Sequence, residues 1–276
     1  MVAVQIRYDP FDASILSDPY PTYRMLRDTV PVYRAEESHT WVLSRHADVQ
    51  AAALDHGTYS SVDGIFPTPP GSNFIGSFLP MMIVMDPPRH DQLRALVSRA
   101  FTPRRVAGLQ DAITQMAAEL FERLDEGSGC ADFVTDFAAI LPAAVIADLL
   151  GVPATDRDQF RVWSSQVVQV DVNHGQTSDA LAAAAAIYAY FTDFLADRRK
   201  NPREDLMSAL ANAAVDGVVL TDEEVLGFCA LLLVAGYETT TNLLGNSAVV
   251  LAQHRQIRRC LGADRTLLGP AVEELL

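Results

Sequence analysis

The longest helical pattern in the sequence lies between Leu220 and His254, and the rest of the chain has to pack around it. It begins at Thr221, whose hydroxyl can accept a hydrogen bond from the amide of Glu224 while the Glu224 carboxylate accepts one from the amide of Thr221. This arrangement, a capping box, fixes the start of a helix. No proline follows before His254, so at about 1.5 Å per residue the helix reaches roughly 50 Å and crosses a whole domain.

The first half of this helix, residues 225–237, is apolar on all sides, which requires burial among other helices or in a membrane. The apolar run ends at Glu238 and is too short to span a bilayer, so a core helix is predicted. Small and polar residues lie at its end, where Ala235 and Gly236 precede Glu238 and a run of threonines. Glycine inside a helix costs about 1 kcal/mol relative to alanine, and a buried carboxylate or hydroxyl costs more unless it has a partner.

Two interpretations of this interruption are open on the residues alone. In the first, the helix reaches the surface and its threonines are solvated. In the second, Ala235 and Gly236 leave the backbone bare, so that a flat ligand can lie against it. Thr239 can then bond back to the carbonyl of Ala235 and open the helix locally, and Glu238 handles protons beside the ligand.

The composition is that of a globular protein with one large core. With 276 residues and 49% hydrophobic content, the chain is expected to form one domain, or two closely joined ones, over residues 1–276. A net charge of -14 argues against binding to nucleic acid or to anionic membrane surfaces. The first residues show no basic segment followed by an apolar one, so neither a secretion signal nor a membrane anchor is expected, and the cytoplasm is the predicted compartment.

The cysteines and histidines do not form a metal-binding pattern. Cys130, Cys229 and Cys260 lack Cys-x-x-Cys spacing, which suits a reducing compartment without structural zinc. The six histidines make no pair at helical spacing. A metal ion held by protein side chains alone is therefore not expected.

The pattern along the chain predicts a mainly α fold with a small β part. A hairpin is expected from residues 32–33 and 41–43. Helices are expected at residues 22–27, 46–54, 106–124, 141–150, 156–170, 178–199, 205–214 and from about 270. The stretch from Gly57 to Met85 lacks helical periodicity and carries three phenylalanines, which favours a lid over an apolar ligand; a disordered loop is the alternative.

The segment that follows begins a helix with an unusual charge. Asp86 can cap it, and two prolines suit its first turn. Arg89 and His90 then lie where the helix dipole disfavours cations, and Arg94 lies one turn after His90 on the same face. Residues 89–105 hold five arginines against one aspartate, a local charge of +4. Either an anion is bound there, or this is a solvated basic face.

Two motifs together resemble those of a known family. Ala235-Gly236-x-Glu238-Thr239-Thr240 in a long buried helix, and Asp86-Pro87-Pro88-x-His90-x-x-x-Arg94 before Ala-Phe-Thr-Pro, are similar to the haem-thiolate monooxygenases, the cytochrome P-450 family of the bacterial soluble type. The resemblance covers the whole chain. It implies a cytochrome P-450 fold around one long buried central helix.

The resemblance also implies roles for these residues. His90 and Arg94 would hold a propionate of haem b (iron protoporphyrin IX), and Ala235 and Gly236 would line the groove in which dioxygen binds. Thr239 and, beside it, Glu238 would supply protons for the hydroxylation of a C–H bond in a small apolar substrate. Electrons would come from a small acidic ferredoxin steered to the basic face at residues 89–105.

The match to the family breaks off at the end of the chain. Glu274 corresponds to the glutamate of a Glu-x-x-Arg motif whose arginine would be the next residue, and the loop with the haem-binding cysteine would lie further on. None of the three cysteines can replace it, so we expect an incomplete cytochrome P-450 domain, inactive by itself. The alternatives are a family-derived, non-catalytic partner or activator of another enzyme, and a small-molecule binding protein unrelated to haem.

Overall fold

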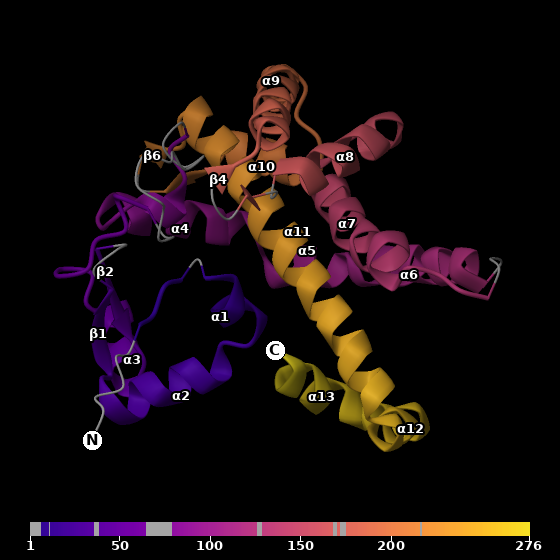
Figure 1. Cartoon of the computed structure of the whole chain (residues 1–276). Coiled ribbons are helices and arrows are strands. Elements are labelled where there is room, and N and C mark those ends of the chain that lie inside the picture. The colour runs from indigo at the N-terminus through magenta and orange to yellow at the C-terminus, as the bar shows by residue number, and fades with distance from the viewer. Residues whose placement is uncertain are drawn as a thin grey trace, which may run out of the picture.

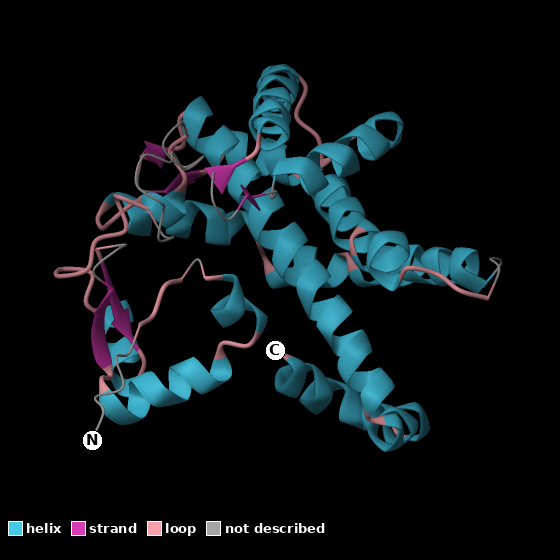
Figure 2. Cartoon of the chain, viewed as in Figure 1, coloured by secondary structure: helices cyan, strands magenta, loops and turns pink. Residues whose placement is uncertain are grey.

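The computed structural model describes residues 7–10, 12–35, 39–64, 79–125, 129–167, 170–171, 175–215 and 217–276. Helices dominate these ranges, and the described strands form three separate two-stranded antiparallel sheets (Figure 2). The predicted fold class, mainly α with a small β part, is confirmed.

The N-terminal part contains α1 (Ala13–Ser17), α2 (Tyr20–Thr29), β1 (Val32–Ala35), β2 (Thr40–Leu43) and α3 (His46–Leu54). Strands β1 and β2 pair in the register Val32 to Leu43, which confirms the predicted hairpin. The two helices expected here are confirmed as α2 and α3. Figure 1 shows this part at the lower left, with the helical body above and to its right.

The next described elements are the 3-10 helix η2 (Met82–Val84), α4 (Arg89–Ala100), α5 (Pro103–Gly108) and α6 (Gln110–Asp125). Asp86 does not cap α4, so that expectation was wrong. The residue at the N-cap position is Pro88, and Asp86 Oδ1 instead accepts a hydrogen bond from the amide of Ser61 at 2.9 Å. The helix expected at residues 106–124 is two helices, since the chain turns at Leu109 between α5 and α6.

The middle of the chain is almost entirely helical. Its elements are the π-helix η3 (Val134–Ala138), α7 (Ile140–Leu150), the 3-10 helix η4 (Ala154–Asp156), α8 (Arg157–Val167), α9 (Ser178–Lys200) and α10 (Leu206–Ala211). Two short hairpins, β3 (Val170–Asp171) with β4 (Gly175–Gln176) and β5 (Ala214–Val215) with β6 (Val218–Val219), were not predicted. Gly151 ends α7 at φ 79°, a backbone conformation that favours glycine.

The long helix is α11 (Asp222–Gln253), followed by α12 (Arg255–Ala263), the 3-10 helix η5 (Arg265–Leu267) and α13 (Leu268–Leu275). Its 32 residues correspond to about 48 Å. The predicted capping box is present, because Thr221 Oγ1 accepts from the amide of Glu224 at 3.2 Å and Glu224 Oε2 accepts from the amide of Thr221 at 2.9 Å. In Figure 1, α11 crosses the middle of the picture, with α12 and α13 beyond its C-terminal end.

The hydrophobic core surrounds the first half of α11. Val225 and Cys229 are fully buried and Leu233 is 1% exposed. Helices α7, α9 and α10 pack against α11 with apolar side chains such as Ile146, Ile187 and Leu210. The predicted core helix is therefore confirmed for this half.

Among the described residues, one helix, α9, has the length and apolar composition of a membrane span. Its buried residues include Ala180, Ile187 and Phe191, and it packs against α8, α10 and α11. Its buried positions recur every three or four residues, so one face of α9 packs into the helical body.

A buried ion pair joins the ends of three helices. The Arg198 side chain, at the end of α9, donates from Nε to Asp205 Oδ2 at 2.5 Å and from Nη2 to the carbonyl of Gly151 at 3.2 Å. Its guanidinium also lies 4.0 Å from the centre of the Phe194 ring. Because Arg198 is only 1% exposed, these partners compensate the cost of burying its charge.

Candidate functional site

The environment of α11 changes at Ala235. Leu233 is buried and Val234 half-buried, whereas Ala235, Glu238 and Thr239 are exposed. Their spacing of three and four residues places these three side chains on one face of the helix. The structure therefore gathers most of the motif residues on one open face in the middle of α11.

The Thr239 hydroxyl donates to the carbonyl oxygen of Ala235 at 2.5 Å, as the spacing predicts. The expected local opening of the helix is absent, since α11 is continuous from Asp222 to Gln253. A carbonyl oxygen has two lone pairs, so it can accept the hydroxyl without giving up its backbone hydrogen bond. Thr241, by contrast, is buried and bonds back to Tyr237.

Gly236 lies on a different side of the helix from Ala235. A Cβ atom added at Gly236 would be 2.9 Å from Cδ1 of Ile146 in α7. The missing side chain therefore allows α11 and α7 to approach each other closely. The surface open to a flat ligand is that of Ala235, and any contact of Gly236 with a ligand would be made by its backbone.

His90 and Arg94 lie one turn apart on α4. The His90 Nδ1 atom is 3.0 Å from Asp91 Oδ1, and 27% of the His90 side chain is exposed. Arg94 is exposed, and within the described residues its guanidinium makes no hydrogen bond or ion pair. Both side chains thus retain donors for an anion such as a carboxylate.

Arg89 does not belong to this group of available cations. Its Nε donates to Glu224 Oε1 at 2.7 Å and its Nη2 to Glu224 Oε2 at 2.5 Å. The Glu224 side chain is 9% exposed, and it also accepts the capping-box bond from Thr221. One carboxylate therefore joins the start of α4 to the start of α11, and no sequence signal indicated this partner, which lies 135 residues away.

A second contact holds the segment before α4 against α11. A Cβ atom added at Gly227 would be 2.6 Å from the carbonyl oxygen of Pro80, so only glycine fits there without movement. The single signal in the sequence is the glycine itself, which costs helix stability in an otherwise apolar run. With the Arg89–Glu224 pair, this contact fixes α4 relative to α11.

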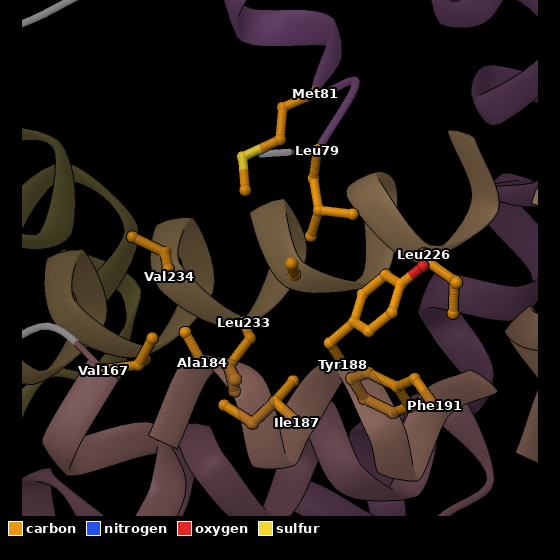
Figure 3. A pocket seen from close by; sticks show the side chains of 11 residues that line it. Leu79, Met81, Val167, Ala184, Ile187, Tyr188, Phe191, Leu226, Leu233 and Val234 are labelled. Atoms are coloured by element: carbon orange, nitrogen blue, oxygen red, sulfur yellow. The ribbon is translucent and has the colours of Figure 1, made fainter. Parts of the chain in front are cut away.

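An apolar cavity lies beside α11 (Figure 3). Leu79 and Met81 approach it from the segment before α4, Ile187 and Phe191 from α9, and Leu233 from α11. It encloses about 30 Å³, room for little more than a water molecule. Residues 65–78 of the predicted lid lie outside the described residues, so the lid prediction concerns mostly chain that the structure does not describe.

The described cysteines are not suited to hold a metal. Cys229 is fully buried in the core, and this burial raises the pKa of its thiol to about 12. Cys130 and Cys260 are exposed. In the part of the chain that the structure describes, no group of three His, Cys, Asp or Glu side chains could bind a metal ion.

The residues present fit the outer contacts of the haem that the resemblance implies. Ala235 offers an open, small surface on α11, and Thr239 lies one turn further along the same face. The side chains of His90 and Arg94 offer hydrogen-bond donors on α4. The Arg89–Glu224 pair joins the N-terminal end of α4 to the N-terminal end of α11. The haem iron would need a thiolate, and the neutral, buried Cys229 does not supply one.

The sequence is similar to those of bacterial cytochrome P450 proteins. The chain is 38% identical over 273 residues to vitamin D(3) 25-hydroxylase of Pseudonocardia autotrophica, covering 98% of this chain and 66% of that protein. It is 37% identical over 270 residues to putative cytochrome P450 123 of Mycobacterium tuberculosis, covering 97% and 67%. The chain thus spans about two thirds of the length of these curated relatives. No protein-family model matches it.

Solved structures agree with the sequence comparisons. Cytochrome P450 CYP109Q5 from Chondromyces apiculatus superimposes with a TM-score of 0.88 at 36% identity, covering 98% of this chain and 68% of that one. CYP109E1 from Bacillus megaterium in complex with testosterone gives a TM-score of 0.80 at 32% identity, covering 94% and 66%.

Proposed function

Because the chain belongs to the cytochrome P450 family, we propose that it forms the propionate-binding and dioxygen-binding part of a haem-thiolate monooxygenase. The observation that carries this proposal is the open face of α11, where Thr239 bonds to Ala235, together with α4, which is fixed to α11 by the Arg89–Glu224 pair. Relatives named as enzymes favour catalysis over the non-catalytic activator.

The cofactor we propose is haem b. When bound, haem supplies the activation of dioxygen and the transfer of one oxygen atom to a C–H bond. His90 and Arg94 donate hydrogen bonds to a propionate, and Arg94 has its whole guanidinium available for this within the described residues. Haem iron in this family also takes a thiolate ligand, and the buried, neutral Cys229 is not suited to supply it.

The face of α11 supplies the proton path. Ala235 and the backbone of Gly236 bound the space for dioxygen, and Thr239 holds a hydroxyl at a fixed position because its proton is donated to the Ala235 carbonyl. In this orientation a lone pair of the hydroxyl oxygen can accept a hydrogen bond from a donor such as water. Glu238 is exposed next to Thr239, where its carboxyl group can exchange protons with solvent.

The substrate we propose is a small apolar molecule. The small cavity on the neighbouring side of α11 is too small for a substrate, but its lining shows that the helix is apolar next to the motif, because its lining residue Val234 directly precedes Ala235. One relative is named a vitamin D(3) hydroxylase and another was solved with testosterone, so apolar ring systems are the first compounds to test.

The electron donor we propose is a small acidic ferredoxin in the cytoplasm. Arg89 is paired with Glu224, and Arg94 is assigned to the propionate. Residues 89–105 still carry a positive charge without these two, because Arg99, Arg104 and Arg105 outnumber the single aspartate. Opposite charges raise the rate at which such a protein docks, and salt would slow it.

The Thr239→Ala substitution tests the proposed function in a complete enzyme, made by joining this chain to the C-terminal third of the CYP109Q5 relative. We expect reductant and oxygen to be consumed at a similar rate while hydrogen peroxide replaces hydroxylated product, because the positioned hydroxyl is lost. Asn242→Ala, an exposed change one turn further along, is the control. Unchanged coupling in Thr239→Ala would assign the threonines to a solvated helix face.

A further inference from the structure

A second hollow lies between the end of α4, α5, α10 and β5, and none of its lining residues is one that we propose to contact haem. It has a volume of about 630 Å³. Its charged lining residues are Arg99, Arg104, Arg105 and Glu204, and alanines of α4, α10 and β5 form much of the rest. Ligand sites typically occupy about 300–1,000 Å³, so the hollow is large enough for a small organic molecule.

Two of the three guanidinium groups donate hydrogen bonds to backbone carbonyls. Arg105 Nη1 donates to the carbonyl of Ala100 at 2.9 Å, and Arg99 Nη1 donates to that of Ala214 at 3.5 Å. Each guanidinium has five N–H donors, so most remain free for a ligand. The 2.9 Å bond orients the Arg105 guanidinium before any ligand arrives, which lowers the entropic cost of binding, whereas the 3.5 Å contact leaves Arg99 only weakly held.

The third guanidinium, that of Arg104, has no polar partner in the part of the chain that the structure describes. Within the described residues, Arg104 makes no hydrogen bond or ion pair, although it lines the same hollow as Glu204. Three positive charges against one negative charge leave +2 around the hollow in a chain whose net charge is -14. Like charges gathered in this way repel one another, and a bound anion relieves that repulsion.

We propose that this hollow is a binding site for a small organic anion with clustered oxyanion charge, either phosphate or carboxylate. Guanidinium groups bind both oxyanions through paired, charge-assisted hydrogen bonds, and the alanine walls leave room for a short carbon skeleton. The site uses none of the residues proposed to contact haem or dioxygen, although Arg99, Arg104 and Arg105 also belong to the basic face proposed to attract ferredoxin. It can therefore be tested on the chain without haem, and its failure would leave the proposed monooxygenase function unaffected.

Isothermal titration calorimetry with pyrophosphate and with citrate, at constant ionic strength, measures the site directly. Binding of either ligand supports the proposal, and the tighter one identifies the preferred oxyanion. Arg104→Ala is expected to weaken binding about tenfold or more, since a charge-assisted bond is lost. Arg104→Lys keeps the positive charge but loses the planar, forked guanidinium, so its affinity should lie between those of the parent chain and Arg104→Ala.

Arg24→Ala is the matched control, because Arg24 is an exposed arginine of α2 that does not line the hollow. This variant changes the net charge equally and should bind like the parent chain. Arg104→Ala removes no hydrogen bond or ion pair among the described residues, so its melting temperature should match the parent's, and this measurement separates lost binding from unfolding. The proposal is overturned if neither anion binds, if Arg104→Ala binds normally, or if Arg24→Ala weakens binding as much as Arg104→Ala.

Discussion

Up to Val234, α11 is enclosed by α7, α9, α10 and the segment before α4, whereas from Ala235 onward much of the same helix is exposed and polar. The first half holds Val225 and Cys229 in full burial, and the second presents Glu238 and Thr239 on its surface. Nothing in the backbone separates the halves, because the helix is continuous. The first half of this one helix therefore packs in the core, and the second half carries the residues of the proposed chemistry.

The packing of the first half determines how precisely the side chains of the second half are positioned. Functional side chains are held best when their supporting element is itself fixed by packing. The first half of α11 is fixed by the core, by Gly227 against Pro80 and by Glu224 against Arg89. Because the helix is continuous, fixing its first half also fixes the position of Thr239. Substitutions in the first half should therefore affect stability, while those in the second should affect chemistry with little effect on stability.

The largest expected effect comes from a buried leucine of the first half. Leu233→Ala should lower the free energy of unfolding by about 2–5 kcal/mol, because it leaves a cavity where the side chain is 1% exposed. Leu243→Ala, in the half-buried second half, should cost about 1 kcal/mol. Urea titrations followed by circular dichroism compare the two, and equal losses would remove the distinction between the halves.

A smaller contrast is expected between two glycines of α11. Gly227→Ala should destabilise by about 1–3 kcal/mol, because its new Cβ would be 2.6 Å from the backbone of Pro80. Gly245→Ala places its Cβ at 3.4 Å from a Val134 methyl group and gains helix propensity, so it should stabilise by up to about 1 kcal/mol. Thermal unfolding of both variants checks the signs. A stabilising Gly227→Ala would show that the segment before α4 is not pressed against α11.

The smallest of the stability effects concerns the charge pair between α4 and α11. Glu224→Gln keeps a side chain that can complete the capping box but removes the charge opposite Arg89, so a loss of about 1.5 kcal/mol is expected. Glu223→Gln, an exposed neighbour in the same turn, should change stability by less than about 0.5 kcal/mol. Denaturant midpoints for both variants make the comparison. A neutral Glu224→Gln would mean that the pair does not fix α4.

Features determined by neighbouring residues could be predicted from the sequence. The capping box of Thr221 and Glu224 involves residues three apart, and the glycine that ends α7 directly follows its last apolar residue. The bond from Thr239 to Ala235 follows from a spacing of four in a helix. In each case the partner is fixed by helix geometry alone.

Features that depend on distant parts of the chain could not be predicted. Asp86 has the sequence position of a cap, yet its carboxylate accepts from Ser61, 25 residues earlier. Arg89 looked like a free cation because Glu224 is 135 residues away. Both local interpretations failed for the same reason, since tertiary folding supplied a partner that no local pattern contains.

Haem retention measures most directly whether α4 and α11 together hold haem. In the chain joined to the C-terminal third of the CYP109Q5 relative, we expect a thiolate-type carbon monoxide difference spectrum. Transfer of haem to apomyoglobin should be at least about tenfold faster in His90→Ala/Arg94→Ala, because two charge-assisted bonds are lost, and unchanged in the control His46→Ala/Arg24→Ala. If the joined protein loaded with haem lacks that spectrum, or if both double variants release haem at the parent rate, α4 and α11 do not hold haem in the proposed way.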